Sequence, residues 1–319
     1  MLIATLAIVA GFFLLIWGAD HFVEGAAALA RNLGVPPLIV GLTIVGMGTS
    51  APELLVSGMA AAQGNAGLGI GNAIGSNITN IGLVLGATAL IVPLRVNSRL
   101  LRKEMPVLLL AMFFAWLLLA DGHLQRLEGV LLLLALAAVL VWMAFTARRA
   151  ATREPLANEL ELPPSMPTQR AAGTFLIGLI VLLGGSKALV WGAVDIAHRL
   201  GVSDLVIGLT IVAFGTSLPE LAASIVSARK GEPDIAVGNV IGSNLFNVLG
   251  VLGLPGLIAP GRLPHGVVDR DFPLMVGMTL LLFLFAFSFR GKERIINRLE
   301  GGILLALFLG YEIWIYFSL

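Results

Sequence analysis

Apolar stretches recur along nearly the whole chain and are separated by short polar segments. A transmembrane helix needs about 20 predominantly apolar residues. The pattern predicts ten such helices, at residues 3–29, 37–62, 69–93, 105–120, 126–147, 172–198, 204–228, 235–259, 272–289 and 300–318. The first stretch has no basic segment before it and no small-residue cleavage site, so we expect a retained helix rather than a signal peptide. The expected fold class is therefore all-α and integral to the membrane.

Composition supports this class and divides the chain. Of the 319 residues, 58% are hydrophobic and only 12% are charged, which excludes an ordinary soluble domain. Cysteine is absent, so disulfides are excluded. The longest polar stretch, residues 148–170, contains several prolines and mixed charge and is predicted to be a linker. It separates a first unit at residues 1–147 from a second unit at residues 171–319.

The two units carry closely similar segments. Residues 41–53 are echoed by residues 208–220, and residues 71–80 are echoed by residues 238–247. Both pairs are offset by 167 positions, so the chain contains two copies of one unit. Five predicted helices fall in each copy. Because five is an odd number, the copies enter the membrane from opposite sides, which predicts an inverted-topology repeat of the kind found in secondary transporters.

Basic residues are concentrated in alternate connections between the predicted helices. Of the 20 Lys and Arg residues, 15 fall in one set of connections, which the positive-inside rule places in the cytoplasm. This assignment puts both termini outside and the linker at 148–170 inside. We therefore expect a multi-pass protein of the inner or plasma membrane, with the lipid bilayer around it and with neither nucleic acid nor an obligate protein as a partner.

Polar residues and helix breakers interrupt the second predicted helix. In the segment Gly48-Thr-Ser-Ala-Pro-Glu53, Pro52 lacks an amide hydrogen and clashes with the carbonyl four residues earlier, which favours local unwinding. Irregular backbone at membrane depth is tolerated where it is buried or lines a cavity, and a cation is a natural partner for the freed carbonyls. Thr49, Ser50 and Glu53 are spaced to share a helix face. The seventh predicted helix repeats this arrangement with Thr216, Ser217 and Glu220.

The third and eighth predicted helices each carry a stripe of amides and hydroxyls at four-residue spacing. The stripes consist of Asn72, Ser76 and Asn80 in the first copy and Asn239, Ser243 and Asn247 in the second. Hydrogen bonding between helices is an alternative role for these residues. Asn77 and Asn244 lie off the stripes, where we expect them to serve helix packing or hydrogen bonding.

Together these side chains offer a set of oxygen ligands with no His and no thiol. Hard cations prefer such ligands, and Ca²⁺ takes about 6–8 oxygens in flexible geometry. Zinc or iron would be expected to recruit His or Cys. Glu53 and Glu220 supply about two negative charges, enough to balance one Ca²⁺ or to accompany Na⁺ ions at separate subsites. Alternate occupancy by Ca²⁺ or Na⁺ is the physical basis of antiport, so we expect transported ions, no cofactor and no enzymatic activity.

The duplicated Gly-Thr-Ser-x-Pro-Glu and Gly-Ser-Asn-x-x-Asn elements resemble those of the sodium/calcium exchanger branch of the cation/Ca²⁺ exchanger superfamily, in its prokaryotic type. The resemblance spans essentially the whole chain. It implies a ten-helix antiporter that exchanges about three Na⁺ for one Ca²⁺ by alternating access and so extrudes Ca²⁺. It also implies that predicted helices 1 and 6 slide past a fixed core. The proton-coupled branch typically has Gly-Asn-Ala-Thr-Glu in place of the first element.

The resemblance also implies a set of ion ligands. Its four central positions fall on Glu53, Asn80, Glu220 and Asn247, and its flanking hydroxyl positions fall on Thr49, Ser50, Ser76, Thr216, Ser217 and Ser243. Backbone carbonyls near Thr49, Ala213 and Thr216 are also implied to reach the ions. Some members carry Asp where this chain has Asn247, and K⁺-dependent members carry an acid there. The amide therefore argues against K⁺ co-transport and leaves two carboxylates in the site.

Several alternatives remain open. Exchange of H⁺ for Ca²⁺ would keep the fold and use Glu53 and Glu220 as titrating groups. An intramembrane hydrolase would use them as general acid and base, although the ligand set is symmetric and lacks a nucleophile partner. A passive channel is a further alternative. Asp20 and Lys187 occupy equivalent positions in the two copies; we expect snorkelling or structural pairing near helix ends, with a latch on the moving helices as the alternative.

Overall fold

The computed structural model describes all residues of the chain except 97, 154–165, 202–212, 288–293 and 319, and it is mostly helical. The first half contains α1 (Leu2–Leu33), α2 (Pro37–Val40), the π-helical segment η1 (Gly41–Val45), α3 (Gly46–Thr49), α4 (Ala51–Ala62), α5 (Ala66–Thr79), the π-helical segment η2 (Asn80–Leu85), α6 (Gly86–Ile91), α7 (Ser98–Leu119) and α8 (Arg126–Arg153). Two short strands, β1 (Leu94–Val96) and β2 (His123–Leu124), flank α7.

The described part of the second half has a similar order of elements. It contains α9 (Thr168–Arg199), α11 (Ala213–Thr216), α12 (Leu218–Arg229), α13 (Pro233–Leu245), the π-helical segment η4 (Phe246–Val251), α14 (Gly253–Ile258), the π-helical segment η5 (Val267–Asp271), α15 (Phe272–Ala286) and α16 (Arg298–Ser318). The strands β3 (Gly261–Arg262) and β4 (Arg294–Ile296) flank α15.

Each of the ten predicted apolar stretches is mainly helical in its described residues, with interruptions such as Ser50 and Ser217 and with a few non-helical residues at the ends, which confirms the helical class. Within the described residues, five helices are long and apolar enough to cross a membrane, or six if the pair bent at Ser50 is counted as one span. A full set of ten membrane crossings remains a prediction. The predicted linker is entered by helix from both sides, because α8 continues to Arg153 and α9 begins at Thr168.

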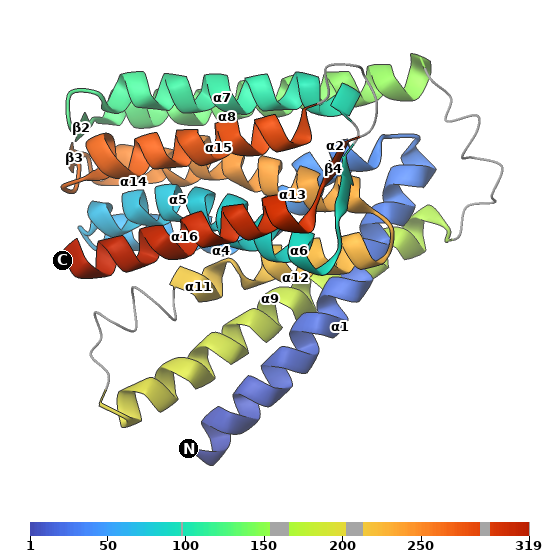
Figure 1. The fold of residues 1–319 in the computed structure, drawn as a ribbon, viewed down its shortest axis with the longest axis horizontal. Helices are drawn as coiled ribbons and strands as arrows, with labels where there is room; N and C mark the ends of the chain where they lie inside the picture. Colours follow the sequence, from blue (N-terminus) through green and yellow to red (C-terminus); the bar gives the residue numbers. More distant parts are fainter. Residues whose placement is uncertain (97, 154–165, 202–212, 288–293, 319) are drawn as a thin grey trace.

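The two longest helices, α1 and α9, form a pair beside the rest of the molecule (Figure 1). Glycines recur every seven residues on each helix and face the partner: Gly11, Gly18 and Gly25 on α1, and Gly178, Gly185 and Gly192 on α9. A Cβ at Gly18 would lie 2.4 Å from the Leu182 nitrogen, and one at Gly185 would lie 2.6 Å from the Leu15 nitrogen. Contacts move toward the start of α9 as α1 proceeds, so the helices are antiparallel and their backbones touch.

The remaining helices pack around α13, whose span from Pro233 to Ile258 is buried inside the protein throughout its most apolar stretch. The segment α2–η1–α3 crosses α13 at close range. A Cβ at Gly238 would lie 2.5 Å from the Leu38 oxygen, and one at Gly41 would lie 2.7 Å from the Ile235 oxygen. Small residues permit this approach, as in many membrane helix pairs. The crossing brings the polar stripe of α13 against α3.

Two antiparallel strand pairs join the halves of the chain. Strand β1 pairs with β4, with Leu94 opposite Ile296, and β2 pairs with β3, with His123 opposite Arg262. Because α7 runs from β1 to β2 and α15 runs from β3 to β4, the two pairs lie at opposite ends of these helices (Figure 1). Each half therefore contributes one strand to each end.

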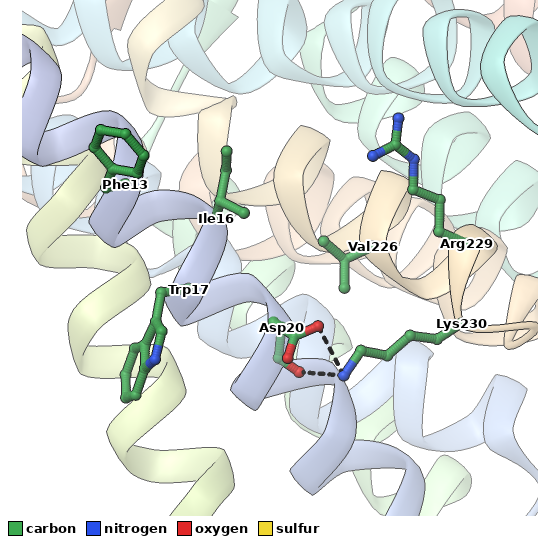
Figure 2. A pocket seen from close by; sticks show the side chains of 7 residues that line it. All are labelled: Phe13, Ile16, Trp17, Asp20, Val226, Arg229 and Lys230. Carbon is green, nitrogen blue, oxygen red and sulfur yellow. Dashed lines mark hydrogen bonds and ion pairs between the residues drawn. The ribbon is translucent and has the colours of Figure 1, made fainter.

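A groove of about 450 Å³ lies between α1 and α12, and an ion pair crosses it (Figure 2). The Lys230 ammonium lies 2.8 Å from an Asp20 carboxylate oxygen and also donates to the Asp20 backbone carbonyl at 3.1 Å. Asp20 on α1 therefore pairs with the residue that directly follows α12. Both side chains remain partly exposed, so the pair adds little to stability.

Candidate cation-binding site

Two helix breaks with matching geometry form the centre of the molecule. Helix α3 ends at Thr49 and α4 begins at Ala51, with Ser50 between them at φ −81° and ψ 3° and a bend of 42°. In the second half, α11 ends and α12 begins on either side of Ser217, which has φ −90° and ψ 3°. Both breaks lie two residues before the proline of the repeated motif. The proline rings therefore act as predicted in both copies.

The two carboxylates occupy the first turns of the helices that follow these breaks. Glu53 lies in the first turn of α4 and Glu220 in the first turn of α12, and neither is exposed. A helix N-terminus favours negative charge, which helps to hold each carboxylate. The Glu220 carboxylate lies beside the hydroxyls of Thr49, Ser50 and Ser243. The two carboxylates are close enough to interact with each other electrostatically.

The two central amides come from the π-helical segments. Asn80 begins η2 and Asn247 lies in η4, and both side chains are fully buried. Segment η2 packs against α12, and η4 packs against α4. Each amide therefore lies beside the helix that carries the other copy's carboxylate. Short π-helical segments are frequent at functional sites because they rotate side chains out of the regular α-helical register.

A set of buried oxygens in this centre has no hydrogen-bond partner among the described residues. Its members come in equivalent pairs from the two copies: the hydroxyls of Ser50 and Ser217, both carboxylate oxygens of Glu53 and Glu220, and the amide oxygens of Asn80 and Asn247. Leaving a buried polar group unpaired costs about 1–3 kcal/mol, and more for a charged group. A cation that accepts these oxygens as ligands removes the cost.

The other predicted hydroxyls surround this set. Thr49 donates to the Asn239 amide oxygen at 3.0 Å and lies 3.3 Å from the Ser243 hydroxyl. Ser76 is almost fully buried on α5. Thr216 ends α11 and is partly buried, whereas Ala213 begins α11 and its side chain lies outside the described residues. The structure thus brings the first-copy motif on α3 against the second-copy stripe on α13.

Three further side chains donate to backbone carbonyls near the carboxylates, and these bonds were not assigned from the sequence. Asn72 donates to the Glu53 carbonyl at 3.2 Å, and Asn239 donates to the Glu220 carbonyl at 3.5 Å. Ser186 on α9 donates to the Gly215 carbonyl at 3.0 Å. That carbonyl lies four residues before Pro219, which has no amide hydrogen to donate to it. The proline spacing was a signal that could have identified it.

The donor set determines which ions fit. Among the described residues, no group of three or more His, Cys, Asp or Glu side chains could hold a metal ion. The site offers two carboxylates together with neutral hydroxyl and amide oxygens, and such ligands suit hard cations. The chemistry of these oxygens therefore suits a hard cation.

Comparison with known proteins decides the family. The model of the family described as sodium/calcium exchanger protein matches residues 3–145 and 170–317. The chain belongs to the sodium/calcium exchanger family. Both repeated motifs and both halves of the candidate site lie within the matched residues. Family membership makes the protein a multi-pass membrane antiporter of the cation/Ca²⁺ type.

Relatives and solved structures of the sodium/calcium exchanger family match over the whole chain. CaxA of Alkalimonas amylolytica is 50% identical over 320 residues, with 100% of each chain covered. The sodium/calcium exchanger MaX1 of Methanosarcina acetivorans is 32% identical over 349 residues, with 98% of each chain covered. A structure of the sodium-calcium exchanger NCX_Mj, soaked with 10 mM Na⁺ and 10 mM Sr²⁺, has a TM-score of 0.83 at 37% identity, and 97% of each chain is covered.

Proposed function

We propose that this antiporter exchanges Na⁺ for Ca²⁺ across the cell membrane by alternating access. In an inward Na⁺ gradient it extrudes Ca²⁺, with about three Na⁺ per Ca²⁺ and without K⁺. The observation that carries the proposal is the set of paired, buried oxygens without hydrogen-bond partners, with two carboxylates at its centre. The ligands are Glu53, Glu220, Asn80, Asn247, Thr49, Ser50, Thr216, Ser217, Ser76 and Ser243, with the backbone carbonyl at Ala213.

The charge of the two carboxylates favours alternate rather than simultaneous binding of Ca²⁺ and Na⁺. Two buried carboxylates balance one Ca²⁺, whereas Ca²⁺ and Na⁺ together would leave excess positive charge in a site without solvent. Repulsion between buried like charges is strong, because the low dielectric of the interior screens it little. Neutral hydroxyl and amide oxygens provide enough ligands for separate Na⁺ subsites around the same carboxylates. Ion occupancy therefore alternates between Ca²⁺ and Na⁺.

We further infer ten transmembrane helices arranged as two inverted five-helix repeats, at residues 1–147 and 171–319 with a linker between them. Two features support this topology. The equivalent helices α1 and α9 are antiparallel. Strands β1 and β3, whose first residues are related by the offset of 167, lie at opposite ends of the bundle. An inverted repeat requires equivalent elements to point in opposite directions.

The nearest competing function is H⁺/Ca²⁺ exchange on the same fold. The ring of serine and threonine hydroxyls beside the carboxylates favours Na⁺, because protons need only the carboxylates whereas Na⁺ needs several oxygen ligands. The first repeated motif also differs from the one typical of the proton-coupled branch. A channel would conduct without counter-transport, so flux that depends on ions across the membrane distinguishes an antiporter.

The test is Ca²⁺ uptake into proteoliposomes loaded with Na⁺, compared with vesicles loaded with K⁺ or choline at the same pH. We expect uptake only with internal Na⁺, and at least a hundredfold loss in Glu53→Gln, because the change removes one of two central charges. Glu128→Gln is the matched control, since Glu128 also lies in a helix first turn but caps Gln125 outside the site. Uptake driven by a pH gradient alone would assign proton coupling instead.

A further inference from the structure

An amide pair crosses from one repeat to the other beside the candidate ligands. The Asn80 side-chain nitrogen donates to the Asn244 side-chain oxygen at 3.1 Å. Both side chains are buried, at 0% and 1% exposure. Asn244 lies on α13 and is not among the residues that form the ion site. Its interaction with Asn80 therefore requires a separate explanation.

The contact fixes which atom of Asn80 faces the site. An amide presents either an oxygen acceptor or a nitrogen donor, and only the oxygen can bind a cation. With its nitrogen held by Asn244, Asn80 leaves its oxygen without a hydrogen-bond partner among the described residues. A carboxylate needs no such control, because both of its atoms are acceptors. A site that uses amides as ligands needs a partner that orients each one.

The equivalent pair, Asn77 and Asn247, is present, but no hydrogen bond joins the two side chains. The offset of 167 relates Asn244 to Asn77 and Asn80 to Asn247. Asn77 is fully buried, and its nitrogen donates to the Ala73 carbonyl at 2.8 Å. This bond turns the Asn77 oxygen outward, where it has no hydrogen-bond partner among the described residues, and the same holds for the Asn247 nitrogen. The unused acceptor and the unused donor are thus the two atoms that the symmetric pair would join.

We infer that Asn244 and Asn77 are positioning residues that hold the amides of Asn80 and Asn247 with their oxygens toward the transported ions. This inference rests on the proposed function and names residues that act through ligands without binding ions. The Asn244–Asn80 bond is formed in the structure, and the Asn77–Asn247 bond forms when an ion draws the Asn247 oxygen into the site. Segment η4, which carries Asn247, packs against α5, which carries Asn77.

The test is a double-mutant cycle on the pair whose bond is formed. Asn244→Leu removes the acceptor and keeps a similar volume, so it limits the cavity that alanine would leave. In the Na⁺-driven uptake assay we expect the KM for Ca²⁺ to rise about tenfold with the maximal rate within twofold. In an Asn80→Ala background, Asn244→Leu should change KM no further. Independent, multiplicative effects of the two changes would overturn the inference, as would an unchanged KM in Asn244→Leu.

Ser57→Ala is the control for loss of a buried hydrogen bond between the halves. Ser57 donates to the Val251 carbonyl at 3.1 Å, so its removal tests general loosening of the core. We expect its KM to stay within twofold of the unmodified protein. An equal rise in KM for Ser57→Ala and Asn244→Leu would reduce Asn244 to a structural residue.

A second measurement keeps the inference testable if a variant transports poorly. The rise in melting temperature that Ca²⁺ produces in detergent should shrink in Asn244→Leu and be retained in Ser57→Ala, because at a given ligand concentration a weaker ligand stabilises the folded state less. A full Ca²⁺-dependent rise in Asn244→Leu would overturn the inference. Failure of the unmodified protein to take up Ca²⁺ against Na⁺ would instead refute the proposed function, and the thermal shift would still report on Asn244.

Discussion

Asn247 is the residue at which this site differs most from an exchanger with a third acid. It is fully buried, and neither its oxygen nor its nitrogen has a hydrogen-bond partner within the described part of the chain. An amide here contributes a neutral oxygen, so the charge of the site is set by Glu53 and Glu220 alone. A site with two negative charges holds Ca²⁺ less tightly than one with three, and release must be fast for turnover.

We therefore predict that Asn247→Asp lowers the KM for Ca²⁺ by about tenfold and lowers the maximal rate by a similar factor, because an added buried charge strengthens binding and slows release. Initial rates of Na⁺-driven Ca²⁺ uptake over a range of Ca²⁺ concentrations measure both quantities. Asn65→Asp is the control, since Asn65 caps α5 through its side-chain oxygen, and Asp retains that oxygen. Unchanged kinetics in Asn247→Asp would show that position 247 lies outside the ion path.

The sequence predicted that Glu53 and Glu220 are central to the candidate site, and the structure buries both side chains near each other; their role as ion ligands remains a prediction. Glu53 and Glu220 are costly inside a membrane, and their duplication marks them as functional. The hydrogen bonding expected of Asn244 is confirmed, but its partner, like the partner of Ser186, could not be predicted in this way. Their partners lie in the other repeat or on another helix, and sequence spacing does not say which helices meet. The assignment of the ligands to individual ions remains a prediction.

At the scale of elements, the pairing of α1 with α9 depends on glycines at specific positions. Gly185 faces α1, where a Cβ would lie 2.6 Å from the Leu15 nitrogen and 2.9 Å from the Gly11 oxygen. The adjacent Gly184 faces away, and a Cβ there would meet no described atom within 4 Å. Two neighbouring glycines on one helix thus differ only in direction.

This difference gives a prediction with an internal control. Gly185→Ala should destabilise the protein by about 1–3 kcal/mol, because the added methyl meets backbone that cannot move aside. Gly184→Ala should be neutral or slightly stabilising, since alanine favours helix over glycine. Thermal unfolding in detergent compares the two. Equal melting temperatures for both variants would contradict the close backbone contact between α1 and α9.

Hydrophobic pattern was enough to predict where helices lie, and it failed to predict their internal irregularities. The breaks at Ser50 and Ser217 followed from Pro52 and Pro219. The π-helical segments η2 and η4 carry no such marker, because the sequence from Asn80 onward is as apolar as a regular helix. Tertiary packing favours the wider π-helical turn, and the apolar pattern of the sequence does not indicate where that turn occurs.

At the scale of the whole molecule, orientation in the membrane follows from the distribution of charge. The chain has no cysteine, so single cysteines can be introduced without further changes. We predict that a membrane-impermeant thiol reagent applied to intact cells labels Gln63→Cys, which lies after α4, and spares Gln169→Cys, which lies at the start of α9. Both positions are exposed glutamines, and each should react fully after the membrane is permeabilised. The reverse pattern would invert the topology.

Duplication of the sequence predicted the symmetry, and the structure adds how the two copies are connected. Strands of two or three residues are too short to show a pattern of alternating polarity, so none of the four was predicted. Their pairing also joins residues far apart in the sequence, as in Leu94 with Ile296. Such contacts are a property of the assembled molecule alone.

The exchange of strands between halves has a consequence for biosynthesis. Strands β1 and β2 are synthesised before β3 and β4, so neither strand of the first half has its partner until the second half is made. Their pairing depends on the last quarter of the chain, and a nascent polypeptide stopped before residue 261 could form neither pair. Both strand pairs can therefore form only after most of the chain has been synthesised.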